Sequence, residues 1–477
     1  MTRPAMQPPE KREITSYGLD RSVTSWVLRP ERPEDVGECI AFAAAKRLRI
    51  CPAGGRNSFG DVFLIGDHVS IDTRRLDRTV AFDAAAGTIT VEAGVLEPTV
   101  LAQVMPLGWQ LPAVSGSLWN TIAGNLSSNV NGKDAWKVGT FGDQVVSFKI
   151  VLADGSTREV DREGDPSLFE AVVGGLGLLG VVTEVTLRLR PIPSPMVECR
   201  SRSAADAREL ADHFARLDPR DTDFSYAWLD GYAEGRRLGR GVSESARFVP
   251  DERAFSAAEL RRELVPPSRI FGLRPETFWG VVSRAWSVLF RVGCEGSVFR
   301  ALGAVKHARA RRAGERVRRV AFPDYQYPMA KRFPHWNLKF APHGFNEVQA
   351  LFPSGAFEAG LRAVLAVCRR RGRTPEVCAV RRHRGDRYLL SFAGDGLSVT
   401  LPFSLAGFRP GELDAFRAEL MDAIAELGGR VYLSKFPYLR PAVLQRMYPR
   451  LAELRAIKQR VDPECRFWSD AAERLLA

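Results

Sequence analysis

Three clusters of small residues constrain the fold of this chain more than any other feature of its sequence. The first is Pro52-Ala-Gly-Gly-Arg-Asn-Ser-Phe-Gly60, the second runs from Ser115 to Lys133, and the third is Gly174-Gly-Leu-Gly-Leu-Leu-Gly180. Glycine allows tight turns and lets backbone N–H groups approach an anion. An ordinary strand connection explains one such cluster but not three in one region. The first cluster is a candidate phosphate cradle, and the small residues of the second allow the backbone to approach a planar or phosphorylated ligand closely.

The spacing of the glycines does not match two common nucleotide-binding motifs. It matches neither Gly-x-Gly-x-x-Gly nor a Walker loop, so a nicotinamide Rossmann site and a P-loop are not indicated. Around the clusters, residues 34–46 and 165–173 have helical patterns, and residues 69–72, 88–92 and 181–189 have strand patterns. A proline-rich stretch at 191–195 then predicts a domain boundary, and the 477 residues suffice for two domains.

Composition limits the classes of partner and compartment. No window reaches about 18 uncharged apolar residues, and no apolar leader follows Met1, so we expect a cytoplasmic protein. The cysteines contain no Cys-x-x-Cys pair, and no metal site is indicated. The net charge of +12 favours anionic partners, but no nucleic-acid recognition module is present.

A long basic section spans residues 265–319. Within it, apolar residues recur at helical spacing between Phe278 and Val292, with Arg284 and Arg291 on another face. Such a helix suits the surface of a membrane, here its inner face, but the same stripe can pack against the rest of the domain. Both readings stay open.

The order and spacing of the three clusters resemble the FAD-binding domain of the vanillyl-alcohol oxidase and p-cresol methylhydroxylase superfamily. The resemblance implies an α+β, two-domain fold in which a substrate domain contains a mainly antiparallel sheet. Many members bind the flavin covalently through a histidine at the position of Asn57, so we expect non-covalent FAD here. The implied cofactor-binding residues are Pro52, Ala53, Gly54, Gly55, Arg56, Asn57, Ser58, Phe59, Gly60, Gly116, Ser117, Thr121, Ala123, Gly124, Asn125, Ser128, Asn131, Gly177, Gly180, Val182 and Tyr432.

Within that superfamily, further stretches resemble the decaprenylphosphoryl-ribose 2′-oxidases of arabinan-making bacteria. They include Ala227-Trp-Leu-Asp230, Gly428-Gly-Arg-Val-Tyr-Leu-Ser-Lys435 and Met447-Tyr-Pro-Arg450. The likeness implies an FAD-binding domain in residues 10–195, a substrate-binding domain in 196–429, and a segment, 430–477, that returns to the first domain. It implies that Lys435 is catalytic, beside the flavin and the reacting hydroxyl. The implied substrate residues are Lys133, Trp228, Tyr327, Gln349, Arg381, Ser398 and Thr400.

Four departures from the family pattern lie in the expected substrate pocket. Phe59 stands where the family has tyrosine, Asn131 for histidine, Ser398 for asparagine and Thr400 for cysteine. They leave the flavin prediction intact but put the identity of the substrate in doubt. Loss of the phenol at position 59 removes a possible proton acceptor, and the other three change the polarity of the pocket.

The resemblance implies oxidation of the ribose 2′-hydroxyl of a polyprenylphosphoryl sugar to a ketone, the first half of an epimerisation to arabinose. The expected partners are a lipid-linked phosphosugar as substrate, an NAD(P)H-dependent short-chain reductase and a peripheral contact with the membrane. Two alternatives remain: a flavin oxidase of a soluble sugar, alditol or aldonolactone, and a non-catalytic flavin-binding partner at the membrane.

Overall fold

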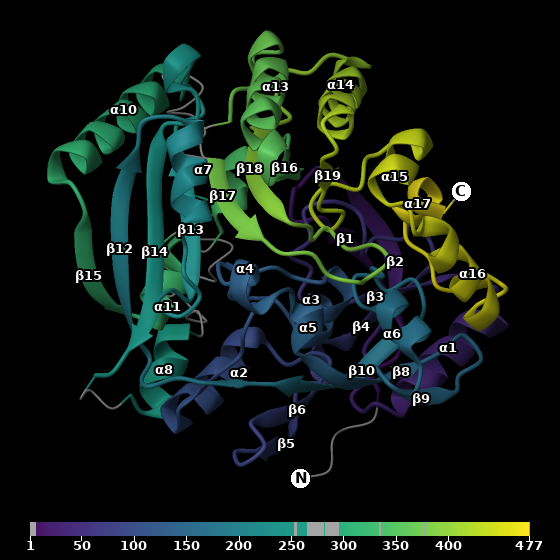
Figure 1. The fold of residues 1–477 in the computed structure, drawn as a ribbon. Helices are drawn as coiled ribbons and strands as arrows, with labels where there is room; N and C mark the ends of the chain where they lie inside the picture. The colour runs from purple at the N-terminus through teal and green to yellow at the C-terminus, as the bar shows by residue number, and fades with distance from the viewer. Residues whose placement is uncertain are drawn as a thin grey trace.

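The computed structural model describes residues 6–251, 255–264, 281, 295–332, 335–375 and 378–476. Helices and mostly antiparallel sheets alternate along the described chain (Figure 1). The prediction of an α+β fold with a mainly antiparallel sheet is confirmed. The amphipathic stretch predicted between Phe278 and Val292 lies, except for Val281, outside the described residues.

A small four-stranded sheet carries the first glycine cluster. Its strand order is β1-β2-β4-β3, and the central β4 is parallel to both of its neighbours and buried along its whole length. The cluster begins where β3 ends, so the sheet fixes its starting point. The elements are β1 (Glu10–Thr15), β2 (Ser22–Leu28), α1 (Asp35–Ala45), β3 (Ile50–Ala53) and β4 (Val69–Asp72).

A five-stranded antiparallel sheet supports the other two clusters. The second cluster includes helix α3, and the third leads into the central strand β10. Helix α6 begins as the sequence predicts, because the Asp165 side chain accepts a hydrogen bond from the Leu168 N–H at 3.0 Å. The elements are β5 (Thr79–Asp83), β6 (Thr88–Glu92), α2 (Glu97–Val104), α3 (Ile122–Ser128), α4 (Ala135–Val138), α5 (Phe141–Gln144), β8 (Val145–Val151), β9 (Thr157–Asp161), α6 (Pro166–Val172) and β10 (Val181–Arg188).

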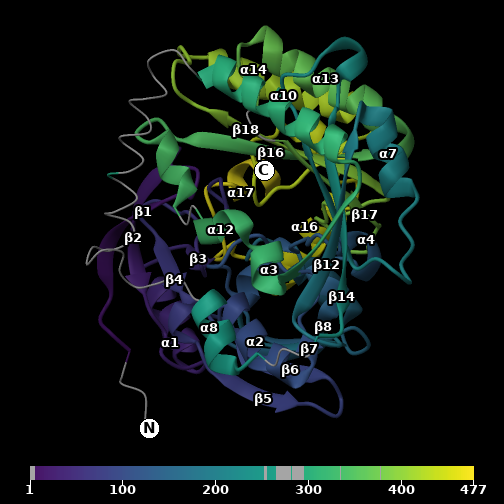
Figure 2. The ribbon, with the colours of Figure 1, turned by 90° about the vertical axis from the view of Figure 1, so that its left-hand side faces the viewer.

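A short pair, β7 (Trp109–Gln110) and β11 (Arg190–Pro191), precedes an antiparallel sheet of eight strands in the order β15-β12-β14-β13-β17-β18-β16-β19. Helix α13 contacts β16 and β18, and α14 packs beside it, as Figures 1 and 2 show. The strands of this eight-stranded sheet are β12 (Met196–Ala204), β13 (Phe224–Leu229), β14 (Gly241–Val249), β15 (Arg316–Ala321), β16 (Phe345–Pro353), β17 (Cys378–His383), β18 (Gly396–Ser404) and β19 (Arg430–Val431). The helices are α7 (Ala207–Ala215), α8 (Ala257–Leu264), α10 (Glu295–Ala313), α11 (Phe322–Gln326), α12 (Pro328–Arg332), α13 (Phe357–Arg370) and α14 (Glu412–Glu426).

The C-terminal segment lies beside the four-stranded sheet (Figure 1). The Ile50 N–H donates to the Arg466 carbonyl at 2.6 Å, and the Trp468 N–H donates to the Ile50 carbonyl at 2.8 Å. The chain therefore returns to the sheet that carries the first cluster, although the domain boundaries themselves stay predictions. The helices are α15 (Pro441–Met447), α16 (Leu451–Val461) and α17 (Ala472–Leu476).

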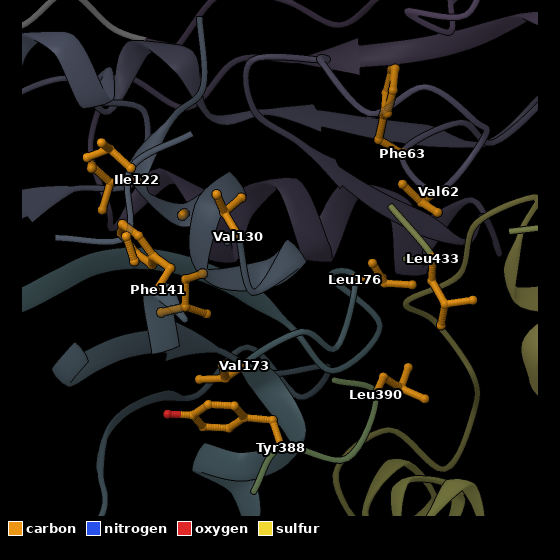
Figure 3. Close-up of a cluster of buried hydrophobic side chains, with 14 of the residues drawn as sticks. Val62, Phe63, Ile122, Val130, Phe141, Val173, Leu176, Tyr388, Leu390 and Leu433 are labelled. Carbon is orange, nitrogen blue, oxygen red and sulfur yellow. The ribbon is translucent and has the colours of Figure 1, made fainter. Parts of the chain in front are cut away.

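One hydrophobic core joins these parts. Figure 3 shows part of this core, with buried side chains from distant stretches of the chain, among them Val62, Val130, Leu176, Leu390 and Leu433. All five are less than a tenth exposed. Of the helices that the structure describes, none has the length and the apolar run needed to cross a bilayer.

Candidate active site

All three glycine-rich clusters border one cavity of about 320 Å³. This volume lies within the usual range of small-molecule sites. The eight-stranded sheet and the turn after β19 close its other end, with Glu347, Gln349, Arg381 and Lys435. Of the sequence-predicted residues, the cavity is lined by Pro52, Ala53, Gly54, Gly55, Arg56, Asn57, Ser58, Phe59, Gly116, Ser117, Thr121, Ala123, Gly124, Ser128, Asn131, Gly177, Gly180, Val182, Gln349, Arg381, Tyr432 and Lys435.

The first and second clusters cross each other at very short range. A Cβ added at Gly55 would lie 2.0 Å from the Trp119 carbonyl oxygen, and one added at Gly54 would lie 2.3 Å from the Thr121 hydroxyl oxygen. Both contacts are too short for any side chain. The two glycines therefore allow the loops to meet and form one wall of the cavity.

A buried carboxyl group holds the second cluster. Glu97 accepts hydrogen bonds from the Ser115 N–H at 3.0 Å, the Asn125 amide at 2.7 Å and the Tyr327 hydroxyl at 2.7 Å. Burial raises the pKa of Glu97 to about 7, although these hydrogen bonds oppose the shift. Glu97 thus fixes both ends of the loop that borders the cavity.

An ion pair and a network of amides form the polar end of the cavity. The Lys435 ammonium lies 2.5 Å from a carboxylate oxygen of Glu347. Glu347 and Gln349 are two residues apart on β16, so their side chains lie on the same face of the strand. The Gln349 amide donates to the Asn131 side chain at 3.2 Å and to the Ser398 hydroxyl at 3.3 Å. Burial lowers the pKa of Lys435, and the charge of Glu347 opposes this shift. This end can bind and polarise a hydroxyl group.

Aromatic rings form a wall next to the ion pair. Phe59 lies edge-on to Tyr17, with ring centroids 5.3 Å apart, and 6.2 Å from Trp336 in the short helix Trp336–Phe340. The Lys435 ammonium is 5.2 Å from the centre of the Phe59 ring. An apolar wall of this kind suits the face of a ring or an acyl chain.

Comparison with known proteins agrees with this geometry. The family model of the FAD binding domain matches residues 24–161. An uncharacterised protein of Streptomyces coelicolor is 30% identical over 397 residues, which cover 78% of this chain and 97% of that protein. The chain belongs to the FAD-binding oxidoreductases of the p-cresol methylhydroxylase type.

Two further relatives match this oxidoreductase over very different lengths of the chain. The decaprenylphosphoryl-beta-D-ribose oxidase of Mycolicibacterium smegmatis is 25% identical over 472 residues, which cover 98% of each chain. A putative D-arabinono-1,4-lactone oxidase of Neurospora crassa is 27% identical over 177 residues, 37% of this chain and 32% of that protein. The first likeness extends through the eight-stranded sheet as well as the flavin-binding part.

The residues around the cavity fit FAD. Within the described residues, the Asn57 Nδ2, Asn120 Oδ1 and Gln349 Oε1 atoms are buried without a hydrogen-bond partner, and all three residues line the cavity. A Cβ added at Gly116 would meet no described atom within 4 Å, so the cavity is open there. Unpaired buried polar atoms are costly unless a ligand pairs with them. When bound, FAD supplies the acceptor for two electrons and a hydrogen.

Some of the predicted site residues lie outside the cavity. Lys133 is buried between the rings of Tyr226 and Tyr325, 4.5 and 4.2 Å from their centres, and donates to the Tyr325 carbonyl. Tyr327 is paired with Glu97, and Trp228 lies 4.1 Å from the Lys306 ammonium. Ser398 and Thr400 lie on β18, beside Gln349.

Gly60 and Asn125 also do not line the cavity. A Cβ on Gly60 would lie 2.6 Å from the Pro437 ring, and the Asn125 side chain donates to Glu97. The roles of all the predicted site residues stay predictions, because position in the cavity does not by itself show a function.

The cavity is also lined by Glu347, Tyr17 and Trp336, which were not predicted from the sequence. Only Glu347 had a usable signal, since it stands two residues before Gln349 and side chains two apart share one face of a strand. Tyr17 and Trp336 had none, because they meet Phe59 only through the packing of segments far apart in sequence.

Proposed function

We propose that this oxidoreductase uses FAD to oxidise a secondary hydroxyl of a sugar carried on a polyprenyl phosphate. On the ribose form of the substrate, the 2′-hydroxyl becomes a ketone, which a partner NAD(P)H-dependent short-chain reductase reduces to complete an epimerisation to arabinose. The observation that carries the proposal is the likeness to the ribose oxidase over 98% of both chains. The lactone oxidase, in contrast, matches over only 37% of this chain.

The cavity supports a substrate with a polar and an apolar part. Glu347, Gln349 and Lys435 gather hydrogen-bonding groups at one end, where a hydroxyl can bind. Trp336, Met329 and Ala330 also line the cavity, and Met329 is 53% exposed. Such an apolar border suits the first units of a prenyl chain, and the lipid carrier would bring the enzyme to the inner face of a membrane.

A soluble sugar, alditol or aldonolactone is the second candidate. The observation that favours it is the hydrogen-bond network of Gln349, because both of its partners, Asn131 and Ser398, depart from the family pattern. Their amide and hydroxyl change the polarity next to the substrate hydroxyl.

Anaerobic bleaching of the flavin absorbance separates these candidates. The purified protein is offered a polyprenylphosphoryl ribose and, separately, free sugars, alditols and aldonolactones. Bleaching by the lipid-linked sugar alone supports the proposal, whereas bleaching by free polyols supports the second candidate. A flavoprotein that none of them reduces would point to a non-catalytic partner.

The variant Lys435→Met tests whether the protein is a catalyst. The variant should bind FAD but reduce it far more slowly, because it removes the cation that stabilises developing negative charge. If the protein is a non-catalytic partner, Lys435→Met should remove the ion pair with Glu347 and change no other measurable property.

A further inference from the structure

Glu347 is the one carboxylate among the described residues that line the cavity. It lies on β16 and is 6% exposed. One of its oxygens, Oε1, is 2.5 Å from the Lys435 ammonium. The other, Oε2, makes no hydrogen bond with any described residue. A carboxylate that borders a cavity with an unused oxygen has room for one more donor, such as the hydroxyl of a ligand.

The other ionisable groups around Glu347 do not accept a proton. Arg381 and Lys435 are cationic donors. Burial, and next the charge of Glu347, raise the pKa of the Tyr17 phenol, so it keeps its own proton. The Tyr432 hydroxyl donates to the Ser128 carbonyl at 2.8 Å, and burial raises its pKa too. Glu347 is thus the acceptor that remains.

We propose that Glu347 takes the proton from the substrate hydroxyl while Lys435 holds the carboxylate in place. The substrate O–H bond breaks and a new O–H bond forms on Glu347. The C–H bond of the same carbon breaks, its hydrogen leaves with both electrons to the acceptor that FAD supplies, and the C–O bond becomes C=O. The proton on Glu347 then returns to solvent, so charge and atoms balance.

The ion pair with Lys435 holds Glu347 both before and after it takes the proton. Lys435 pairs with Oε1 of Glu347 before reaction, and it remains as a cation when the carboxylate takes the proton. Phe59 cannot replace Glu347 as acceptor, since it has no hydroxyl. The inference rests on the proposed oxidation of a hydroxyl, but not on which sugar carries it.

The test compares Glu347→Gln with the wild type and with Glu358→Gln, an exposed residue of α13 that pairs with Arg362. Glutamine keeps the size of the side chain and a hydrogen bond to Lys435 but accepts no proton. With any substrate that bleaches the wild-type flavin, Glu347→Gln should reduce FAD about 10²–10⁴-fold more slowly. Glu358→Gln should match the wild type.

Two further readouts separate proton transfer from a structural role. Lys435, Arg381 and Tyr17 are the ionisable groups that face Glu347. The rate of flavin reduction by the wild type should fall at acid pH, and this acid limb should disappear in Glu347→Gln because glutamine accepts no proton. The affinities for FAD and for the ketone product, read from flavin spectral changes, should be unchanged, because a ketone has no proton to give.

Three results would overturn the inference. One is a normal rate in Glu347→Gln, and another is a slow variant that keeps the acid limb of the wild type. The third is loss of FAD or product binding in parallel with rate, which would make Glu347 structural. If no sugar bleaches the wild type, the proposed function itself fails, and that outcome is distinct because it appears without any variant.

Discussion

The Lys458 ammonium donates a hydrogen bond of 2.8 Å to the carbonyl oxygen of Leu178, 280 residues earlier in the chain. It also donates to the Phe467 carbonyl at 2.7 Å and forms an ion pair with the buried Asp462. The C-terminal helix α16 therefore holds the third glycine cluster, whose Gly177 and Gly180 border the cavity.

Lys458→Met should destabilise the fold and weaken FAD binding. The change leaves the Asp462 carboxylate buried without its cation, which typically costs about 3–5 kcal/mol. Urea unfolding and FAD titration measure the two effects. Lys149→Met, which breaks a more exposed pair with Glu184, is the control and should cost about 0–1 kcal/mol. Equal midpoints for the two variants would contradict the role of Lys458.

Gly55→Ala should abolish FAD binding. Its new Cβ would lie 2.0 Å from the Trp119 carbonyl oxygen, so the first and second clusters would be pushed apart. Flavin content after purification is the measurement. Gly37→Ala on α1 is the matched control, because a Cβ there meets nothing within 4 Å among the described residues. A yellow Gly55→Ala protein with normal affinity would show that the loops tolerate separation.

Acid precipitation should release the flavin from the polypeptide. The expectation follows from Asn57, whose amide cannot form the bond to flavin that a histidine at this position forms in related enzymes. After centrifugation, the FAD absorbance should remain in the supernatant. Flavin that stays with the precipitated chain would mean a covalent link through another residue.

The stability of the protein should rise as the pH falls from about 7 to about 4.5, through the contribution of Glu97. Burial raises the pKa of Glu97 from 4.5 to about 7, so the folded state binds this proton more tightly than the unfolded chain does. Stability from this group is therefore full below the unfolded pKa and lost as pH rises through the folded one. The whole span is on the order of 3 kcal/mol.

Glu97→Gln tests this contribution, since glutamine carries no titrating proton. Its thermal midpoint should change less between pH 5 and pH 7, roughly the ends of the window given by the two pKa values, than the wild-type midpoint does. Glu426→Gln on α14, which is exposed, should keep the wild-type dependence. An unchanged pH slope in Glu97→Gln would place the titrating group elsewhere.

The glycine-rich part of the site could be predicted from sequence because its signals are local. Each glycine cluster is a continuous stretch, and its small residues are needed wherever backbones approach closely, as Gly55 does with Trp119. The family resemblance also located Lys435 and Gln349, which the structure brings to the same cavity.

The polar end of the cavity was less predictable because it is assembled from residues far apart in sequence. Glu347 and Lys435 are 88 residues apart and meet only once β16 and the turn after β19 are in place. Lys133 is the last residue of the second cluster, yet its side chain lies away from the cavity, between two tyrosine rings. Neighbourhood in sequence does not reveal the direction of a side chain.

The register of β16 decides whether the polar end of the cavity forms at all. Glu347 and Gln349 reach the cavity because β16 pairs with β18 so that Gln349 stands opposite Thr400. A slip of one residue would turn both side chains to the opposite face and present Asn346 and Val348 instead. A misaligned sheet could therefore still leave the glycine-rich loops able to take up flavin, giving a coloured but inert protein rather than a partly active one.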